Sequence, residues 1–157
     1  MIRFLLCALV VVSASACLDR MILDGTLKST RDAASAFDTL PDLEVAKLGA
    51  ASSLVQIEGM QKLAPDNEDG LFLLLQGWTS YAGAFIEDDW EQAYDRGDDE
   101  AEEAAATRAR LAYERAIGFG TVLLDRHHPG FAKAIRNIDT MKAWLAPFDK
   151  SKTKILL

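Results

Sequence analysis

The chain has 157 residues, of which half are hydrophobic, and this is enough for one domain with a core of ordinary size. Its 24 acidic and 17 basic side chains give a formal net charge of -7. A negative surface repels phosphate backbones, so we expect no nucleic-acid partner.

The first 16 residues have the pattern of a secretory signal peptide. Arg3 supplies a positive start, residues 4–12 are an unbroken apolar run, and residues 13–16 (Ser-Ala-Ser-Ala) are small. The run is shorter than the 20 or so apolar residues of a permanent membrane span. We therefore expect residues 1–16 to be removed and the chain to be exported.

Cys17 directly follows these small residues, as in the lipobox of bacterial lipoproteins. Ala14 stands where leucine is more usual, so a soluble secreted protein is the alternative. Cys7 leaves with the signal peptide, and an unlipidated Cys17 would be an unpaired thiol. We predict lipidation of Cys17. Because Leu18 rather than aspartate follows it, we also predict sorting to the outer membrane.

Residues 17–40 are expected to form a lipid-anchored tether with one short helix, marked by the apolar side chains between Met21 and Leu27. The polar stretch Lys28–Asp32 is expected to interrupt that helix. From residue 41 to residue 157 we expect a helical repeat domain.

The first helix of this domain is expected from about Asp42 to Leu63. Pro41 suits the start of a helix, and Asp42 and Glu44 favour the positive end of the helix dipole. Apolar residues recur every three or four positions, as one buried helical face requires. They are Leu43, Ala46, Ala50, Leu54 and Ile57.

A short segment, Leu63–Asn67 (LAPDN), separates this helix from the next. Asn67 and the acidic residues beside it supply capping oxygens for a second helix. That helix keeps the apolar spacing as far as Trp78, Tyr81 and Phe85. These aromatic side chains are expected to be core, and they are also the candidates for a ligand or partner groove.

The stretch from Glu87 to Glu103 holds ten acidic residues and one basic residue, with Gly97 in the middle. Such a charge run is typical of a solvated loop with frayed helix ends. A third helix is expected from Glu100 to Arg126, and its small residues allow a neighbouring helix to approach closely. They include Ala105, Ala109, Ala112 and Ala116. A short helix over residues 131–138 and apolar residues from Met141 to Phe148 close the pattern.

No stretch alternates with period two, so the expected fold class is all-α. The helices fit antiparallel hairpins of tetratricopeptide-like repeats in part. Pro65 stands at the joint position of such a repeat, although Met60 is large where a small residue is usual. Ala109, Tyr113 and Ala116 match fully. An irregular helical bundle is the alternative, because any amphipathic helix has this spacing.

The order of these features resembles the TRAP-transporter-associated tetratricopeptide lipoprotein family, often called TatT. The resemblance covers residues 42–146. It rests on Glu58 before the Pro65–Asn67 joint, on GWTSYA at Gly77–Ala82, and on YERA at Tyr113–Ala116. It implies a helical repeat protein anchored in the periplasm that forms a homo-oligomer and contacts the solute-binding subunit of a TRAP-type transporter.

The family's members usually continue through further helices beyond the equivalent of Lys154–Leu157. We therefore expect this chain to correspond to a front half, in which terminal Ile155, Leu156 and Leu157 and the last helix are left uncovered. Uncovered apolar surface of this kind favours self-association.

Few residues suggest catalysis. His127 and His128 are adjacent, so on a helix they point about 100° apart and do not converge on one metal ion. The acidic run lacks the pattern of a calcium loop, and neither a nucleophile elbow nor a phosphate loop is present. We expect no enzyme, no metal and no cofactor. A carrier that holds an apolar small molecule between its helices is the alternative function.

Overall fold

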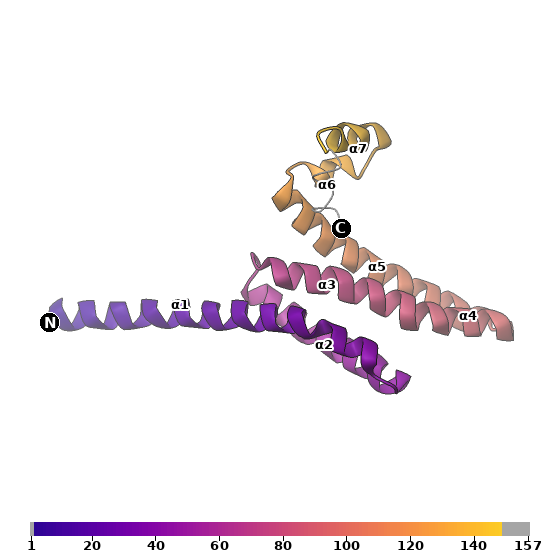
Figure 1. The fold of residues 1–157 in the computed structure, drawn as a ribbon, viewed down its shortest axis with the longest axis horizontal. Coiled ribbons are helices and arrows are strands. Elements are labelled where there is room, and N and C mark those ends of the chain that lie inside the picture. Colours follow the sequence, from indigo (N-terminus) through magenta and orange to yellow (C-terminus); the bar gives the residue numbers. More distant parts are fainter. Residues whose placement is uncertain (1, 149–157) are drawn as a thin grey trace. The chain divides into compact units, whose positions relative to one another are not determined.

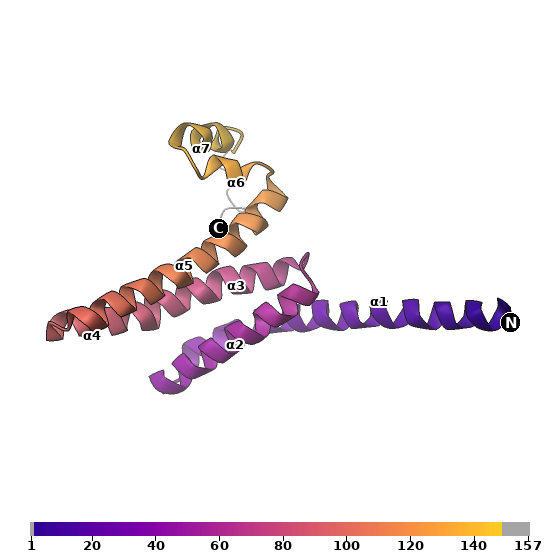
Figure 2. The ribbon, with the colours of Figure 1, turned by 180° about the vertical axis from the view of Figure 1, so that it is seen from behind.

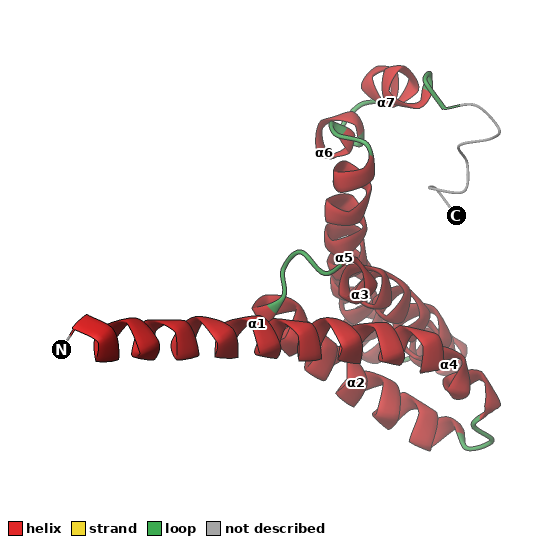
Figure 3. Ribbon diagram, turned by 60° about the vertical axis from the view of Figure 1, so that its left-hand side comes forward, coloured by secondary structure: helices red, strands yellow, loops and turns green. Residues whose placement is uncertain are grey.

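A computed structural model describes residues 2–148, with the backbone alone for residues 2–17 and Asp38. Within this range every regular element is a helix, and Figure 3 shows helices joined by loops. The all-α class is therefore confirmed. The chain divides into two compact units, residues 1–70 and 71–157, each described by itself. The expected uncovered end at Ile155–Leu157 lies outside the described residues.

The first unit contains α1 (Ile2–Ala33), the 3-10 helix η1 (Ala34–Thr39) and α2 (Leu43–Leu63), and Figure 1 labels α1 and α2. Asp42 caps α2, because its carboxylate accepts hydrogen bonds from the backbone N–H groups of Glu44 and Val45. The expected helix bounds are confirmed to within one residue. The buried face of α2 includes Ala46, Leu54, Ile57 and Gln61.

The expected interruption of the N-terminal helix is wrong, because α1 continues through Lys28–Asp32 as far as Ala33. The polar side chains of this stretch support the helix: Lys28 pairs with Asp32 one turn on, and the Thr30 hydroxyl donates to the Thr26 carbonyl. Leu27 is fully buried and Arg31 forms a 2.8 Å ion pair with Asp69. The C-terminal part of the helix is thus held by the rest of the unit at Leu27 and Arg31.

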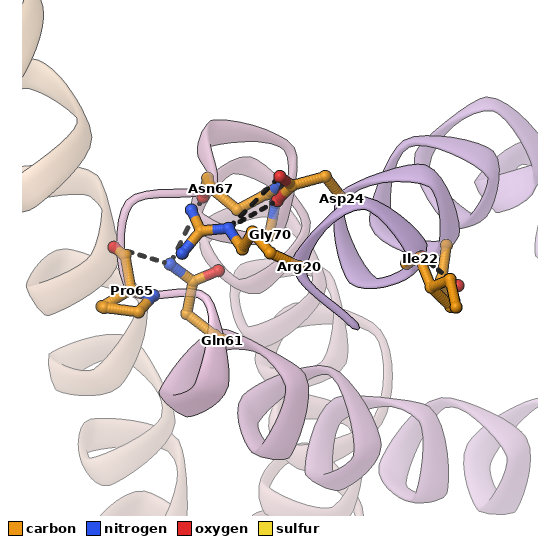
Figure 4. Close-up of polar contacts among 8 residues, drawn as sticks. Arg20, Ile22, Asp24, Gln61, Pro65, Asn67 and Gly70 are labelled. Carbon is orange, nitrogen blue, oxygen red and sulfur yellow. Dashed lines mark hydrogen bonds and ion pairs between the residues drawn. The ribbon is translucent and has the colours of Figure 1, made fainter. Parts of the chain in front are cut away.

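The LAPDN segment joins α2 to α3 (Glu68–Tyr81) and also fastens α1 (Figure 4). Asn67 caps α3 by accepting from the Gly70 N–H at 2.8 Å, and its side-chain amide donates to Asp24 of α1 at 2.7 Å. Gln61 of α2 donates to the carbonyls of Pro65 and Asn67. Two side chains therefore satisfy the buried backbone of the joint and connect all three helices.

Gly70 leaves room for this arrangement. A Cβ atom at residue 70 would lie 2.0 Å from Gln61 Oε1 and 3.2 Å from Leu27 Cδ1. Gln61 is buried, and its Oε1 atom accepts no hydrogen bond from the described residues. This oxygen lies instead against the Cα–H group of Gly70. The joint thus requires glycine for a close approach.

Replacing Asn67 with alanine should expose the contribution of the joint to stability. Loss of the helix cap should cost about 1 kcal/mol. The hydrogen bond from the Asn67 amide, more than the Arg20 side chain, lowers the pKa of Asp24. The ionised Asp24 carboxylate therefore stabilises the folded state at pH values above its unfolded pKa of about 3.9, and this stabilisation is lost as the pH falls through the lowered pKa of the folded state. Urea unfolding should therefore show a larger loss for Asn67→Ala at pH 7 than at pH 2.5. Equal losses at the two pH values would contradict the assigned bond.

In the second unit one long helix folds back on another. The first consists of α3, a π-helical turn η2 (Ala82–Ile86) and α4 (Glu87–Arg96), and the second is α5 (Asp99–His127). Gly97, with φ of 66°, ends α4, and Asp98 caps α5. Figures 1 and 2 both show α5 lying along α3 and α4. This is one antiparallel hairpin, and the repeat type stays a prediction.

The expectation of a solvated loop between Glu87 and Glu103 is wrong, because α4 and the start of α5 occupy it. The acidic residues are interleaved with apolar ones at helical spacing. Ile86 and Ala93 are buried, and Trp90 stacks on Tyr94 with ring centroids 5.8 Å apart. The charges thus form the solvent side of an amphipathic helix.

The small residues of α5 form its packing face, as expected. Ala105, Ala112, Ala116 and Gly120 are buried. Ala112 belongs to a core cluster with Ala82 and Ile86 of the facing helix. A Cβ at Gly120 would lie 3.1 Å from Leu75 Cδ1 of α3, so the two helices approach closely here as well.

A small aromatic cluster follows α5. The short helices α6 (Phe131–Ala134) and α7 (Ile138–Leu145) place Trp144 against His128 and Phe131, and the Trp144 indole N–H donates to the His128 carbonyl. Trp144 is buried, so the expectation that the last helix is left uncovered is wrong for its largest side chain. Leu145 remains exposed.

Candidate functional site

An open hollow of about 270 Å³ lies between the two long helices of the second unit. Trp78 and Tyr81 come from α3, and Ile86 comes from the π-helical turn. The remaining lining side chains lie on α5 at spacings of three, one and three residues, which place them on one face of that helix. They are Arg108, Leu111, Ala112 and Arg115.

The π-helical turn gives the hollow its shape. Such a turn inserts one residue into an α-helix and shifts the face that follows it, and it often occurs at functional sites. Here it brings Ala82, Phe85 and Ile86 into the core, while Trp78 and Tyr81 pack at the edge of the core cluster. The aromatic rings therefore lie partly exposed beside α5 instead of being covered by it.

Two arginine side chains add positive charge to this mainly apolar surface. The Arg115 guanidinium lies 5.9 Å from the ring centroids of both Trp78 and Phe119, within the range of cation–π attraction. Arg108 forms a 3.3 Å ion pair with Asp89 of α4 and remains about half exposed. The hollow thus presents aromatic rings, an exposed leucine and two guanidinium groups.

The aromatic residues singled out from the sequence lie next to each other. The rings of Trp78 and Tyr81 meet edge to face with centroids 6.3 Å apart, and both line the hollow. Phe85 lies 5.4 Å from Tyr81 but is buried in the core, where it supports Tyr81. The contributions of Ile86 and of α5 were missed. The repeat of Arg108, Leu111 and Arg115 on one helical face was the signal that could have indicated them.

A hydrogen bond beside the hollow ties the hairpin together. The Tyr113 hydroxyl of α5 donates to Glu87 Oε1 of α4 at 2.8 Å. This bond to a carboxylate, together with partial burial, raises the pKa of Tyr113 above its ordinary value. Tyr113 therefore stays neutral and donates at physiological pH, and its role here is structural.

The sequence matches the model of one protein family over most of its length. The sequence model of the TRAP transporter T-component family matches residues 39–157. The chain belongs to this family. Comparisons with curated proteins and with solved structures gave no match. Membership associates this T-component with TRAP transport as an accessory component and with the periplasm.

The two histidines and Cys17 are the other candidate residues from the sequence. His127 ends α5, and His128 packs edge to face on Trp144 and Phe148 with ring centroids 5.1 and 4.5 Å away. Across the described side chains, histidine, cysteine and acidic groups form no cluster that could hold a metal ion. The side chain of Cys17 lies outside the described part.

Within the residues that the structure describes, no helix is long and apolar enough to cross a bilayer.

Proposed function

We propose that this T-component is a non-enzymatic periplasmic lipoprotein scaffold that is anchored to the outer membrane through Cys17 and contacts the solute-binding subunit of a TRAP-type transporter. The observation that carries the proposal is the family match over residues 39–157. The signal-like N-terminus, with small residues before Cys17, supports export and anchoring.

The hollow of the second unit is the surface proposed for this contact. Tryptophan, tyrosine and arginine are the residues most enriched where protein interfaces gain their binding energy. Trp78, Tyr81, Arg108 and Arg115 gather here around Leu111, whose side chain is 53% exposed. An exposed leucine beside aromatic rings and guanidinium groups is suited to inserting into, or receiving, a side chain of a partner protein.

The size of the hollow favours a protein partner over a carried small molecule. Its volume is about 270 Å³. Pockets that enclose drug-sized ligands have about 300–1,000 Å³ and bury most of the ligand. The hollow lies near the lower end of that range and is open to solvent, so it would leave much of an apolar ligand in water. Extraction of the purified protein with organic solvent tests the carrier alternative, because a carrier should release a bound lipid or hydrophobic solute and a scaffold should not.

Substituting Leu111 with aspartate should weaken binding to the solute-binding subunit at least tenfold, about 1.4 kcal/mol, because it places a charge in the centre of the contact. Ile117→Asp is the matched control, since Ile117 is equally exposed at 54% on the same helix but lies outside the hollow. Isothermal titration calorimetry with the purified subunit measures both. Equal affinities for the two variants would contradict the proposed surface.

We further propose that the T-component forms a homo-oligomer. Large apolar side chains occupy one exposed face of α2, with spacings of three, seven and eight residues. They are Val45, Leu48, Val55 and Leu63. The unlipidated chain from Leu18 should therefore melt at a temperature that rises with protein concentration. Sedimentation that shows a monomer with a melting temperature independent of concentration would refute this.

A further inference from the structure

The exposed side of α1 changes character along its length. Leu18, Met21 and Ile22 are large apolar side chains with 52%, 67% and 57% exposure. Their positions share one side of the helix, away from the side on which Asp24 and Leu27 are held. Farther along, the exposed residues are polar, among them Thr26, Lys28, Ser29 and Asp32. Among the side chains of α1 that the structure describes, the large exposed apolar ones are thus confined to the turns that directly follow Cys17.

This part of α1 is fixed close to residue 17. Arg20 pairs with Asp24 at 3.2 Å, and Asp24 accepts from Asn67 at 2.7 Å (Figure 4). The helix is therefore attached to the body of the first unit at Asp24, seven residues beyond Cys17, and the Arg20–Asp24 pair supports the turn of α1 just before it. A lipid on Cys17 would hold the body near the bilayer surface through this short stretch of helix.

We propose that Leu18, Met21 and Ile22 enter the membrane leaflet to which Cys17 is anchored, and so orient the protein on that surface. This inference rests on the lipidation of Cys17 proposed above. At 1.5 Å per residue, Ile22 lies about 8 Å along the helix from Cys17. A helix that lies in the interface buries its apolar face about 5–10 Å into the leaflet. Because Leu18, Met21 and Ile22 share one side of α1 and stay within this short distance of Cys17, a lipid on Cys17 would keep all three at the leaflet surface.

The extent and charge of the patch favour lipid over a second copy of the chain. Three half-exposed side chains supply on the order of 300 Å², well below the 800 Å² or so that each partner of a stable protein interface buries. Arg20 is paired with Asp24 and Lys28 with Asp32, so the charge beside the patch is the exposed carboxylate of Asp19, which attracts no anionic head group. The contact is therefore apolar, and net attraction to anionic head groups is unnecessary.

Nitroxide labels test the contact in the lipidated protein. The chain has two cysteines, and with Cys7 in the removed signal and Cys17 blocked by lipid, Ile22→Cys or Ser29→Cys supplies a single reactive thiol. Ser29 is exposed seven residues farther on the same face of α1, which makes it a matched control. The protein is placed in vesicles of phosphatidylethanolamine and phosphatidylglycerol. The ratio of oxygen to water-soluble nickel accessibility is then measured by electron paramagnetic resonance.

The proposal expects a severalfold higher oxygen-to-nickel ratio at residue 22 than at residue 29. Equal, water-like ratios in protein whose Cys17 carries lipid by mass spectrometry would overturn the membrane contact while leaving the anchor in place. Mass spectra that show no lipid on Cys17 would overturn both proposals. Magnetic coupling between residue-22 labels of two copies, with neither label in lipid, would place a second copy on this face and also overturn the contact.

Discussion

Leu27→Ala should destabilise the first unit by about 2–5 kcal/mol, the usual range for removing a fully buried leucine side chain. Leu27 has no exposed surface, and its Cδ1 lies against Gly70, where a Cβ would be only 3.2 Å away. The substitution leaves a cavity between α1 and the start of α3, at the point where Asn67 and Gln61 fasten the joint. Such a loss would show that α1 belongs to the folded unit.

Leu43→Ala is the control for this measurement. Leu43 lies at the start of α2 with 61% of its surface exposed and outside the face proposed for self-association, so its removal should change stability by no more than about 0.5 kcal/mol. Urea unfolding followed by far-ultraviolet circular dichroism compares the two variants with the wild type. If both variants unfold like the wild type, α1 does not pack in solution as the structure shows.

Ala112→Leu should overpack the seam between α5 and the facing helix and cost about 1–3 kcal/mol. Ala112 is buried in the cluster with Ala82 and Ile86, where Trp78 and Tyr81 pack around it. A leucine there must push the two helices apart or force side chains from their preferred rotamers. The same change should also distort the hollow, because Ala112 lines it.

Ala106→Leu provides the comparison, since Ala106 is exposed on the same helix and leucine is an equally good helix former. Thermal unfolding is followed by tryptophan fluorescence, which combines the signal of Trp78, packed against the cluster, with those of Trp90 and Trp144. A neutral result for Ala112→Leu would mean that the alanine face of α5 is not a helix–helix seam.

Local signals in the sequence were sufficient for the starts of α2 and α3. Asp42 and Asn67 each accept a backbone hydrogen bond at the helix start. Asp98 and Gly97 provide the same kind of signal at the start of α5 and the end of α4, but the acidic run around them led to the prediction of a loop. The spacing of small residues likewise indicated the packing face of α5, because a buried stripe follows from helical geometry alone.

The errors arose where long-range packing decides the structure. The count of charges suggested a loop at Glu87–Glu103, although Ile86, Trp90 and Ala93 supplied an apolar face for α4. The course of α1 past Lys28 depends on contacts to residues about forty positions later, such as the ion pair of Arg31 with Asp69. No local pattern reports such contacts.

The hollow could be foreseen only in part for the same reason. Helical spacing made Trp78 and Tyr81 neighbours, which the structure bears out. The π-helical turn and the register between α3 and α5 decide which side chains of α5 meet them, and both depend on packing between elements. Arg108 and Arg115 therefore became candidates only once the hairpin was known.

Site-specific photo-crosslinking in intact cells tests the central claim, contact with a TRAP solute-binding subunit, most directly. A benzophenone amino acid is placed at Leu111 in the hollow or at Ile117, which is equally exposed outside it. The proposed scaffold predicts that the probe at residue 111 crosslinks to the solute-binding subunit on illumination, while the probe at residue 117 does so far less. Crosslinks at residue 111 to other proteins alone, with the subunit present in the same cells, would contradict it.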